Sequence, residues 1–237
     1  MRRPILLLAV IILLSSTGKT QAAFIVGGPG DPGNGNSFPF GSSSIVAYQQ
    51  VYAASNFTGP MSISGLTFYN NNAAFAGTTI NTATYTVQLS TTNAAVNGLS
   101  NTFASNLGGD NQIVFSGVLS GTAFPSFTIN TSLFNYDPTA GNLLMTIFKT
   151  GATSSGGSVF NDARNGTAGG LFSRKYSLSS TTTADNAGFD SNWGLVTGFE
   201  TAPANAVPAP AGLLLAMTGL PLLVGMMRRR LTPAVAS

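Results

Sequence analysis

The stretch between residues 45 and 200 is built from short strand-like runs that are separated by clusters of turn residues. From Ala83 to Leu89, apolar and polar residues alternate, which is the period-two pattern of a strand with one buried face. Similar runs occupy residues 45–52, 61–69, 80–90, 112–119, 124–130, 143–149, 171–178 and 193–200. Many short strands without regular helices between them predict an all-β fold, and we expect an antiparallel β-sandwich or jelly-roll-like domain.

Two local features modify this pattern. The run at 61–69 changes phase between Ile63 and Leu66, so Gly65 is expected to mark a β-bulge. The stretches 73–76 and 93–107 leave room for one short helix.

Residues 24–200 are expected to form a single domain with a sizeable core. All sixteen Phe, all six Tyr and Trp193 fall within this region. The chain has no Cys, so the domain must be stable without disulfides. Its first part, 24–44, is rich in Gly, Pro, Ser and Asn and is expected to be an irregular leader.

The N-terminal segment 1–23 has the three parts of a secretory signal peptide. Arg2 and Arg3 precede an apolar stretch at 5–14, and small residues follow as far as Ala22 and Ala23. The apolar stretch is too short for a permanent membrane anchor. We therefore expect export through the general secretion translocon, with cleavage after Ala22 or Ala23.

The C-terminal block consists of a Pro/Ala linker at 201–210, an uncharged apolar run at 211–227 and a basic tail at 228–237. As a helix, the seventeen residues of the apolar run span about 25 Å, slightly less than the hydrocarbon core of a bilayer. Pro221 is expected to kink this helix, which membrane helices tolerate. The arginines that follow hold the end of the chain in the cytoplasm. We expect a single transmembrane helix.

The order of a short Pro motif, an apolar helix, an Arg cluster and the chain end resembles the PEP-CTERM sorting signal. The residues that carry the resemblance are Val207, Pro208, Ala209 and Pro210, the run 211–227, and Arg228, Arg229 and Arg230. Ala209 departs from the family pattern, which has Glu between the two prolines. The resemblance implies that exosortase, a membrane-embedded cysteine protease or transpeptidase of Gram-negative bacteria, recognises the tail. The family's association with exopolysaccharide implies a structural or adhesive role.

The charge of the domain is opposite in sign to that of the whole chain, which is +3. Six of the ten basic residues lie in the two terminal segments, and all seven acidic residues lie in the domain, which leaves it at −3. The basic residues that remain in the domain are Lys149, Arg164, Arg174 and Lys175. A nucleic-acid surface needs clustered Lys and Arg on the folded domain, so we expect no nucleic-acid partner.

The absence of His and Cys restricts the chemistry of the domain. It excludes Ser-His-Asp and Cys-His catalysis and metal sites built on imidazole or thiolate. The acidic residues leave a carboxylate-dependent glycan-active enzyme as an alternative. Such an enzyme would need two acids that face each other across a cleft. Asp110 and Asp137, however, occupy turn sequences, where Asp stabilises the backbone. We expect a non-enzymatic protein without catalytic residues.

Asp185 and Asp190 are candidates for metal ligands. Calcium is the metal that suits them, because it takes carboxylate and amide oxygens from loops. The segment has no recognised calcium-loop spacing, and we expect no other cofactor.

Trp193 is a candidate ligand contact, because sugars bind to aromatic faces beside planar polar groups. Tyr48, Tyr52 and Tyr69 lie among many Asn and Gln residues and are also expected to be exposed, although aromatic residues on strands usually belong to the core.

The main prediction is an exported protein of the cell-envelope surface or extracellular matrix, with an inner-membrane precursor. A carbohydrate-binding, lectin-like module is the alternative.

Overall fold

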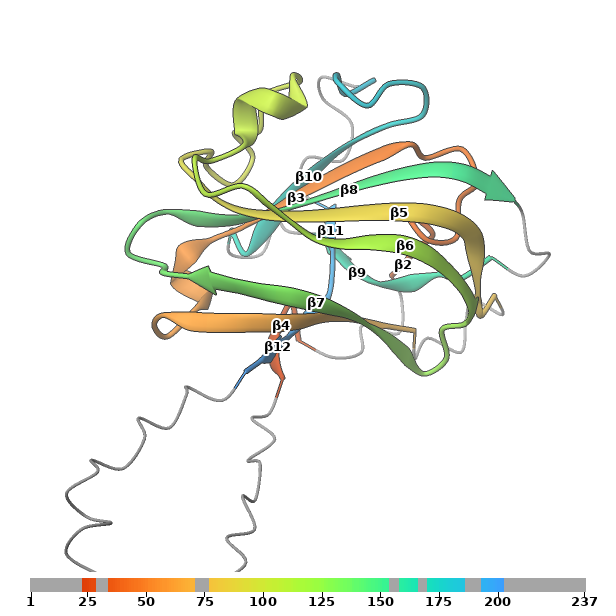
Figure 1. Cartoon of the computed structure of the whole chain (residues 1–237), viewed down its shortest axis with the longest axis horizontal. Helices are drawn as coiled ribbons and strands as arrows, with labels where there is room; N and C mark the ends of the chain where they lie inside the picture. Colours follow the sequence, from red (N-terminus) through yellow and green to blue (C-terminus); the bar gives the residue numbers. More distant parts are fainter. Residues whose placement is uncertain are drawn as a thin grey trace, which may run out of the picture.

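The computed structural model describes residues 23–28, 34–70, 77–153, 158–165, 170–185 and 193–202. Within these ranges the protein is all-β, with two 3₁₀ turns at Ala54–Asn56 and Phe103–Asn106 and no α-helix. Its two larger sheets face each other as the layers of a β-sandwich (Figure 1). No helix in the described ranges has the length and apolar character to cross a membrane. The predicted signal peptide, apart from Ala23, and the predicted transmembrane helix lie outside these ranges.

The five-stranded layer is antiparallel, with the strand order β10-β3-β8-β5-β6. In this spatial order the strands are Phe172–Ser177, Ala47–Tyr52, Asn142–Thr153, Thr79–Thr92 and Gln112–Thr122. The alternation predicted for β5 is confirmed, since Ala83, Tyr85, Val87 and Leu89 are all buried. The central strand β8 is nearly continuous in apolar residues because both of its faces are covered.

The four-stranded layer is also antiparallel, with the order β1-β12-β4-β7. These strands are Phe24–Val26, Thr197–Thr201, Met61–Tyr69 and Ser126–Tyr136. The register of β4 against β7 shifts between Ile63 and Gly65, which confirms the predicted bulge. β1 pairs with β12, so the first and last strands of the described domain are neighbours.

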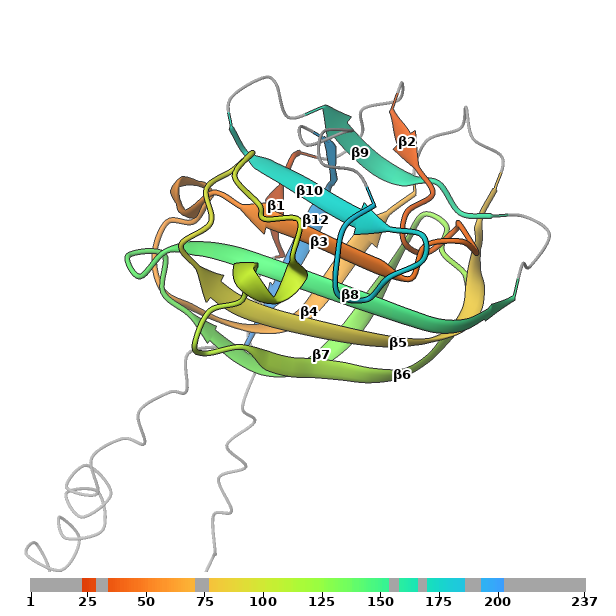
Figure 2. The same ribbon diagram turned by 90° about the horizontal axis from the view of Figure 1, so that it is seen from above.

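A third, smaller sheet has the order β11-β9-β2, with β11 at Trp193–Leu195, β9 at Asn161–Asn165 and β2 at Gly35–Asn36. β11 contacts the edge strand β10 of one layer, and β9 contacts β4 of the other layer. In Figure 2, β9 and β2 lie beyond β10 at one side of the molecule. The small sheet therefore closes that side of the sandwich.

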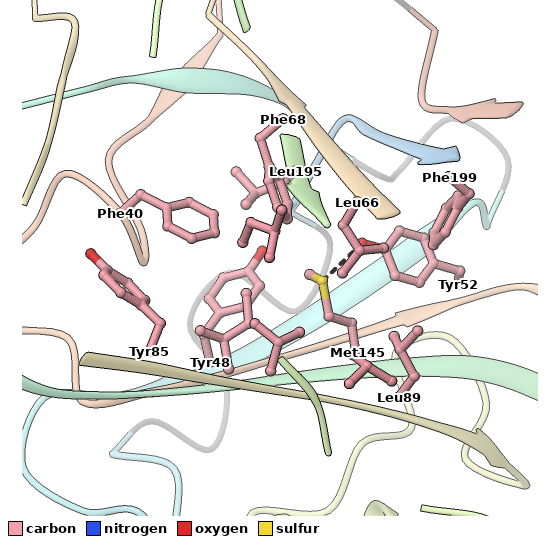
Figure 3. Packing of buried hydrophobic residues seen from close by; sticks show 14 of the residues in the cluster. Phe40, Tyr48, Tyr52, Leu66, Phe68, Tyr85, Leu89, Met145, Leu195 and Phe199 are labelled. Carbon is pink, nitrogen blue, oxygen red and sulfur yellow. Dashed lines mark hydrogen bonds between the residues drawn. The ribbon is translucent and has the colours of Figure 1, made fainter. Parts of the chain in front are cut away.

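Aromatic side chains from both layers fill the core (Figure 3). The ring of Tyr52 meets that of Phe199 from the opposite layer edge to face, with centroids 5.1 Å apart and planes at 83°. The ring centroid of Phe40 lies 4.7 Å from that of Phe68 and 5.5 Å from that of Tyr85, and both pairs are tilted. Each buried ring contributes about 2 kcal/mol through removal from water, and edge-to-face pairs add to this.

Several details differ from the predictions. The 24–44 leader is not wholly irregular, because it contains β1 and β2, and both strands pair with partners distant in sequence. The predicted strand at 193–200 is interrupted at Val196, whose N–H donates to Asp162 O at 2.9 Å. Of the two stretches with room for a short helix, 93–107 contains only the 3₁₀ turn at Phe103–Asn106, and 73–76 lies outside the described ranges.

Tyr48 and Tyr52, which the sequence suggested were exposed, are fully buried. Both lie on β3, an inner strand flanked by β10 and β8 and covered on both faces. Their hydroxyl groups have partners inside the protein, because Tyr48 Oη donates to Gln50 Oε1 and Tyr52 Oη lies 2.8 Å from Thr197 Oγ1. These two residues belong to the core and not to a ligand surface.

Candidate ligand-binding site

A pocket of about 330 Å³ lies where the small sheet meets the edge strand β10. Its lining comes from β2 and the segment after it, from the residue before β9, from β10 and from β11. The lining residues are Gly35, Asn36, Ser37, Phe38, Phe160, Arg174 and Trp193. Trp193, a candidate from the sequence, is thus placed on the wall of a pocket together with residues from three other parts of the chain.

Trp193 is partly buried and packs against the core at the start of β11. The next residue, Gly194, lies against the Phe172 ring, and a Cβ atom there would be 2.3 Å from Phe172 Cδ2. A side chain at this position is therefore excluded, and the glycine lets β11 approach β10 closely. This close approach helps to hold Trp193 in the pocket lining.

Arg174 supplies the positive charge of the pocket. Its side chain is 4% exposed, and the guanidinium carbon lies 5.5 Å from the Phe38 ring and 5.5 Å from the Tyr176 ring. The Tyr48 ring is 5.9 Å away on the side of the core. Attraction between the cation and these rings holds the guanidinium in place.

Tyr48 and Gln50 form the layer beneath Arg174. Tyr48 Oη donates to Gln50 Oε1 at 2.6 Å, and Gln50 pairs directly with Arg174 in the β3–β10 register. Burial raises the pKa of Tyr48 to about 12, although the positive charge of Arg174 acts in the opposite direction. The phenol is therefore a neutral hydrogen-bonding group that positions its neighbours.

Asn36 supplies a polar amide that is incompletely satisfied. Its side chain is 9% exposed, and its Oδ1 accepts a hydrogen bond from Phe38 N–H at 3.0 Å. Its Nδ2 has no hydrogen-bond partner among the described residues. Asn161 lies opposite in the β2–β9 register, is fully buried, and likewise leaves Oδ1 and Nδ2 without partners in this part of the structure. Unpaired buried amides are costly, so they call for an explanation.

Asp185, a predicted calcium candidate, stabilises a turn. Its carboxylate accepts hydrogen bonds from Ser177 Oγ at 2.7 Å, from Ser179 Oγ at 3.1 Å and from Leu178 N–H. The Leu178 N–H bond, followed by that of Ser177, lowers the pKa of Asp185. Asp190 lies outside the described ranges. Among the residues that are described, no three acidic, His or Cys side chains gather as a metal site.

Three other carboxylates, those of Asp110, Asp137 and Glu200, also accept local hydrogen bonds. Asp110 Oδ1 accepts from Thr91 N–H at 2.8 Å, and Asp137 Oδ1 accepts from Thr139 N–H at 2.9 Å. Hydrogen bonds from the Thr139 N–H and hydroxyl lower the pKa of Asp137. Glu200 Oε1 accepts from Thr67 Oγ1 at 2.7 Å within the β4–β12 pair. Each of these acids already has a local hydrogen-bonding role.

Sequence reasoning identified Trp193 but missed Arg174, Asn36 and Phe38. A signal for Arg174 was present, because the period of two along β10 places it on the same face as the apolar Phe172 and Tyr176. A charged residue on a core-facing row requires a partner. Asn36 and Phe38 gave no comparable signal, since they lie in the Gly/Pro/Ser/Asn-rich leader.

The predicted sorting-signal residues, 207–210 and 228–230, lie outside the described ranges. Comparison of the chain with protein-family models, with curated proteins and with solved structures returns no match.

Proposed function

We propose that the protein is exported and sorted by exosortase to the cell-envelope surface or the extracellular matrix, where it acts as a structural or adhesive component without enzymatic activity. The observation that carries this proposal is the C-terminal order of a Pro motif, an uncharged apolar run and Arg228 to Arg230. The segment 211–227 is proposed to be a transmembrane helix of the precursor, and 1–23 its signal peptide.

The limits of the folded domain are compatible with this processing. Cleavage after Ala22 or Ala23 leaves β1 intact, because that strand begins at Phe24. β12 ends at Thr201, where the linker toward the sorting motif begins. Because Phe24 pairs with Phe199, the two ends of the domain leave from adjacent strands. A domain held through its C-terminal linker therefore has both ends at one place and leaves its other surfaces open to partners.

The test is fractionation of cells that produce the chain with and without exosortase. With the enzyme, we expect a protein shortened at both ends in the surface or extracellular fraction. Without it, an inner-membrane precursor that retains its tail should accumulate. Identical mass and location in the two strains would overturn the sorting proposal.

A further inference from the structure

We propose that the pocket between Trp193, Asn36 and Arg174 binds one acidic sugar ring, a hexuronate unit of a saccharide. This ligand assignment goes beyond the proposed sorting function. It follows from the polarity of the lining, from the unpaired amide of Asn36 and from the aromatic walls.

Asn36, Arg174 and Trp193 each offer hydrogen-bond donors to this pocket. Asn36 Oδ1 is already occupied by Phe38 N–H, which leaves the Nδ2 donor of that amide. Arg174 contributes a guanidinium and Trp193 an indole N–H, both of which can only donate. Among the described residues that line the pocket, none carries a carboxylate. A lining of donors that includes a guanidinium favours a ligand with acceptors and a negative charge.

Asn36 gives an independent indication of a ligand. An amide that is nine-tenths buried and has an unused N–H group loses its hydrogen bonds to water on folding. An acceptor brought by a ligand would restore them. Because Asn36 lines the pocket, that acceptor can be supplied from the pocket side.

The aromatic residues select a ligand with an apolar face. Trp193, Phe38 and Phe160 line the same pocket, and the Phe38 ring is fixed by the Tyr176 ring at 4.8 Å. A pyranose presents C–H groups on its faces and hydroxyl groups at its rim, which suits an aromatic wall beside polar donors. The volume of about 330 Å³ is at the lower end for ligand pockets, which fits a single ring.

These features assign a place to each part of a hexuronate. The carboxylate faces Arg174, because a guanidinium binds a carboxylate through two parallel hydrogen bonds. A ring or hydroxyl oxygen accepts from Asn36 Nδ2, and one face of the ring lies on the Trp193 indole. A neutral hexose has the same ring but lacks the charge.

The binding test uses the intrinsic fluorescence of the full chain in mild detergent. The sequence contains one tryptophan, so the emission reports on Trp193. Methyl β-D-glucuronoside and methyl β-D-glucoside are titrated as a pair that differs at C6, and the galacturonoside and galactoside as a second pair. We expect a saturable change in emission with a uronoside, and at least tenfold weaker binding of its neutral partner, confirmed by calorimetry. Equal binding of acidic and neutral sugars would overturn the proposal, as would no binding of any sugar by either method.

The matched variants are Asn36→Asp and Asn135→Asp. Asn36→Asp keeps the acceptor for Phe38 N–H but replaces the Nδ2 donor by a negatively charged oxygen. Asn135→Asp adds the same charge on β7, outside the pocket, and keeps the acceptor for Ser62 Oγ. We expect about tenfold or greater loss of uronoside affinity in the first and wild-type affinity in the second.

Equal affinity in the two variants would place the sugar elsewhere and overturn the assignment. Unfolding curves show whether each variant is folded. If Asn36→Asp does not fold, Trp193→Phe followed by calorimetry takes its place, with a weaker uronoside affinity expected and an unchanged one contradicting the proposal. Sorting by exosortase is measured in cells, whereas sugar binding is measured on the purified chain. A negative result in one experiment therefore leaves the other proposal standing.

Discussion

The side-chain amide of Gln50 pairs with the backbone of Leu195 through two hydrogen bonds. Gln50 Nε2 donates to Leu195 O at 2.9 Å, and Leu195 N–H donates to Gln50 Oε1 at 2.8 Å. Gln50 is fully buried on β3 of the five-stranded sheet, and Leu195 lies at the end of β11 of the small sheet. The side-chain amide therefore links these two sheets by the same pair of N–H and C=O hydrogen bonds that a neighbouring strand would make. Because Trp193 is two residues away, this pair also fixes the wall of the pocket.

Replacing Gln50 with Leu should lower the free energy of unfolding by about 3 kcal/mol. The substitution removes the acceptor of Leu195 N–H, the acceptor of the Tyr48 hydroxyl and one of the two donors to Leu195 O, which keeps Thr197 Oγ1. Each buried group left unsatisfied costs about 1–3 kcal/mol. Gln88→Leu is the matched control, because Gln88 Oε1 accepts only an exposed bond from Asn111. Urea unfolding should show a change below about 0.5 kcal/mol for this control. Equal losses in the two variants would contradict this role of Gln50.

Gly41 occupies a position that has no room for a side chain. A Cβ atom there would lie 2.0 Å from Val159 O, a backbone atom that cannot move without displacing the chain. We expect Gly41→Ala to lower the free energy of unfolding by about 1–3 kcal/mol, as overpacking does elsewhere. Gly59→Ala is the control, because a Cβ there meets nothing within 4 Å. It should leave stability unchanged or raise it slightly, since alanine restricts the unfolded chain. Thermal unfolding of the two variants measures the difference.

Lys149 should make stability depend on pH in the alkaline range. The side chain is 2% exposed, and its Nζ donates to Pro39 O at 2.9 Å and to Ser42 O. Burial lowers the pKa of Lys149 from 10.5 to about 8. Between these values the unfolded chain binds more protons than the folded protein. The Lys149 contribution therefore makes stability rise as pH increases from about 8 toward 10.5.

Tyrosines oppose this rise above their ordinary pKa of 10.0. Burial raises the pKa of Tyr48 and Tyr85, so the unfolded chain ionises first and stability falls at higher pH. Urea unfolding between pH 7 and pH 10 isolates the lysine effect. We expect Lys149→Met to remove the rise above pH 8, and Lys175→Met, on the edge strand β10, to retain it. A wild-type pH profile in Lys149→Met would show that this lysine does not titrate as inferred.

The repeating strands could be predicted from the sequence because their side chains alternate between core and surface. β4, β5 and β8 all show a local pattern, and even the bulge at Gly65 is visible as a change of phase. β9 could not be predicted, because its sequence Asn-Asp-Ala-Arg-Asn has low strand propensity. It becomes a strand through its partners, β11 on one side and β2 on the other.

Of the residues that line the candidate pocket, only Trp193 could be predicted from the sequence. Trp193 stood out as a single tryptophan beside turn residues, whereas Asn36 and Arg174 are 157 and 19 positions away from it in the chain. Tertiary packing brings the three together, and no local pattern encodes it. The same reason explains Gln49 and Gln50, two polar residues that are fully buried on β3 because their amides bind distant backbone or side-chain groups.

The tail arginines provide the sharpest test of sorting. Replacing Arg228, Arg229 and Arg230 with glutamine should weaken retention of the precursor, because the charges oppose passage of the helix end across the bilayer. Insertion scales give about 2.5–3.5 kcal/mol for one such charge at the membrane centre, and three of them hold a short helix interrupted by Pro221. We expect the neutral variant outside the cell with its tail uncut, and the triple Lys variant, which keeps the charge, to behave as the original. The measurement is the mass of the released protein by mass spectrometry. If the glutamine variant is released at the same cleaved mass as the original, the arginines are not part of the signal.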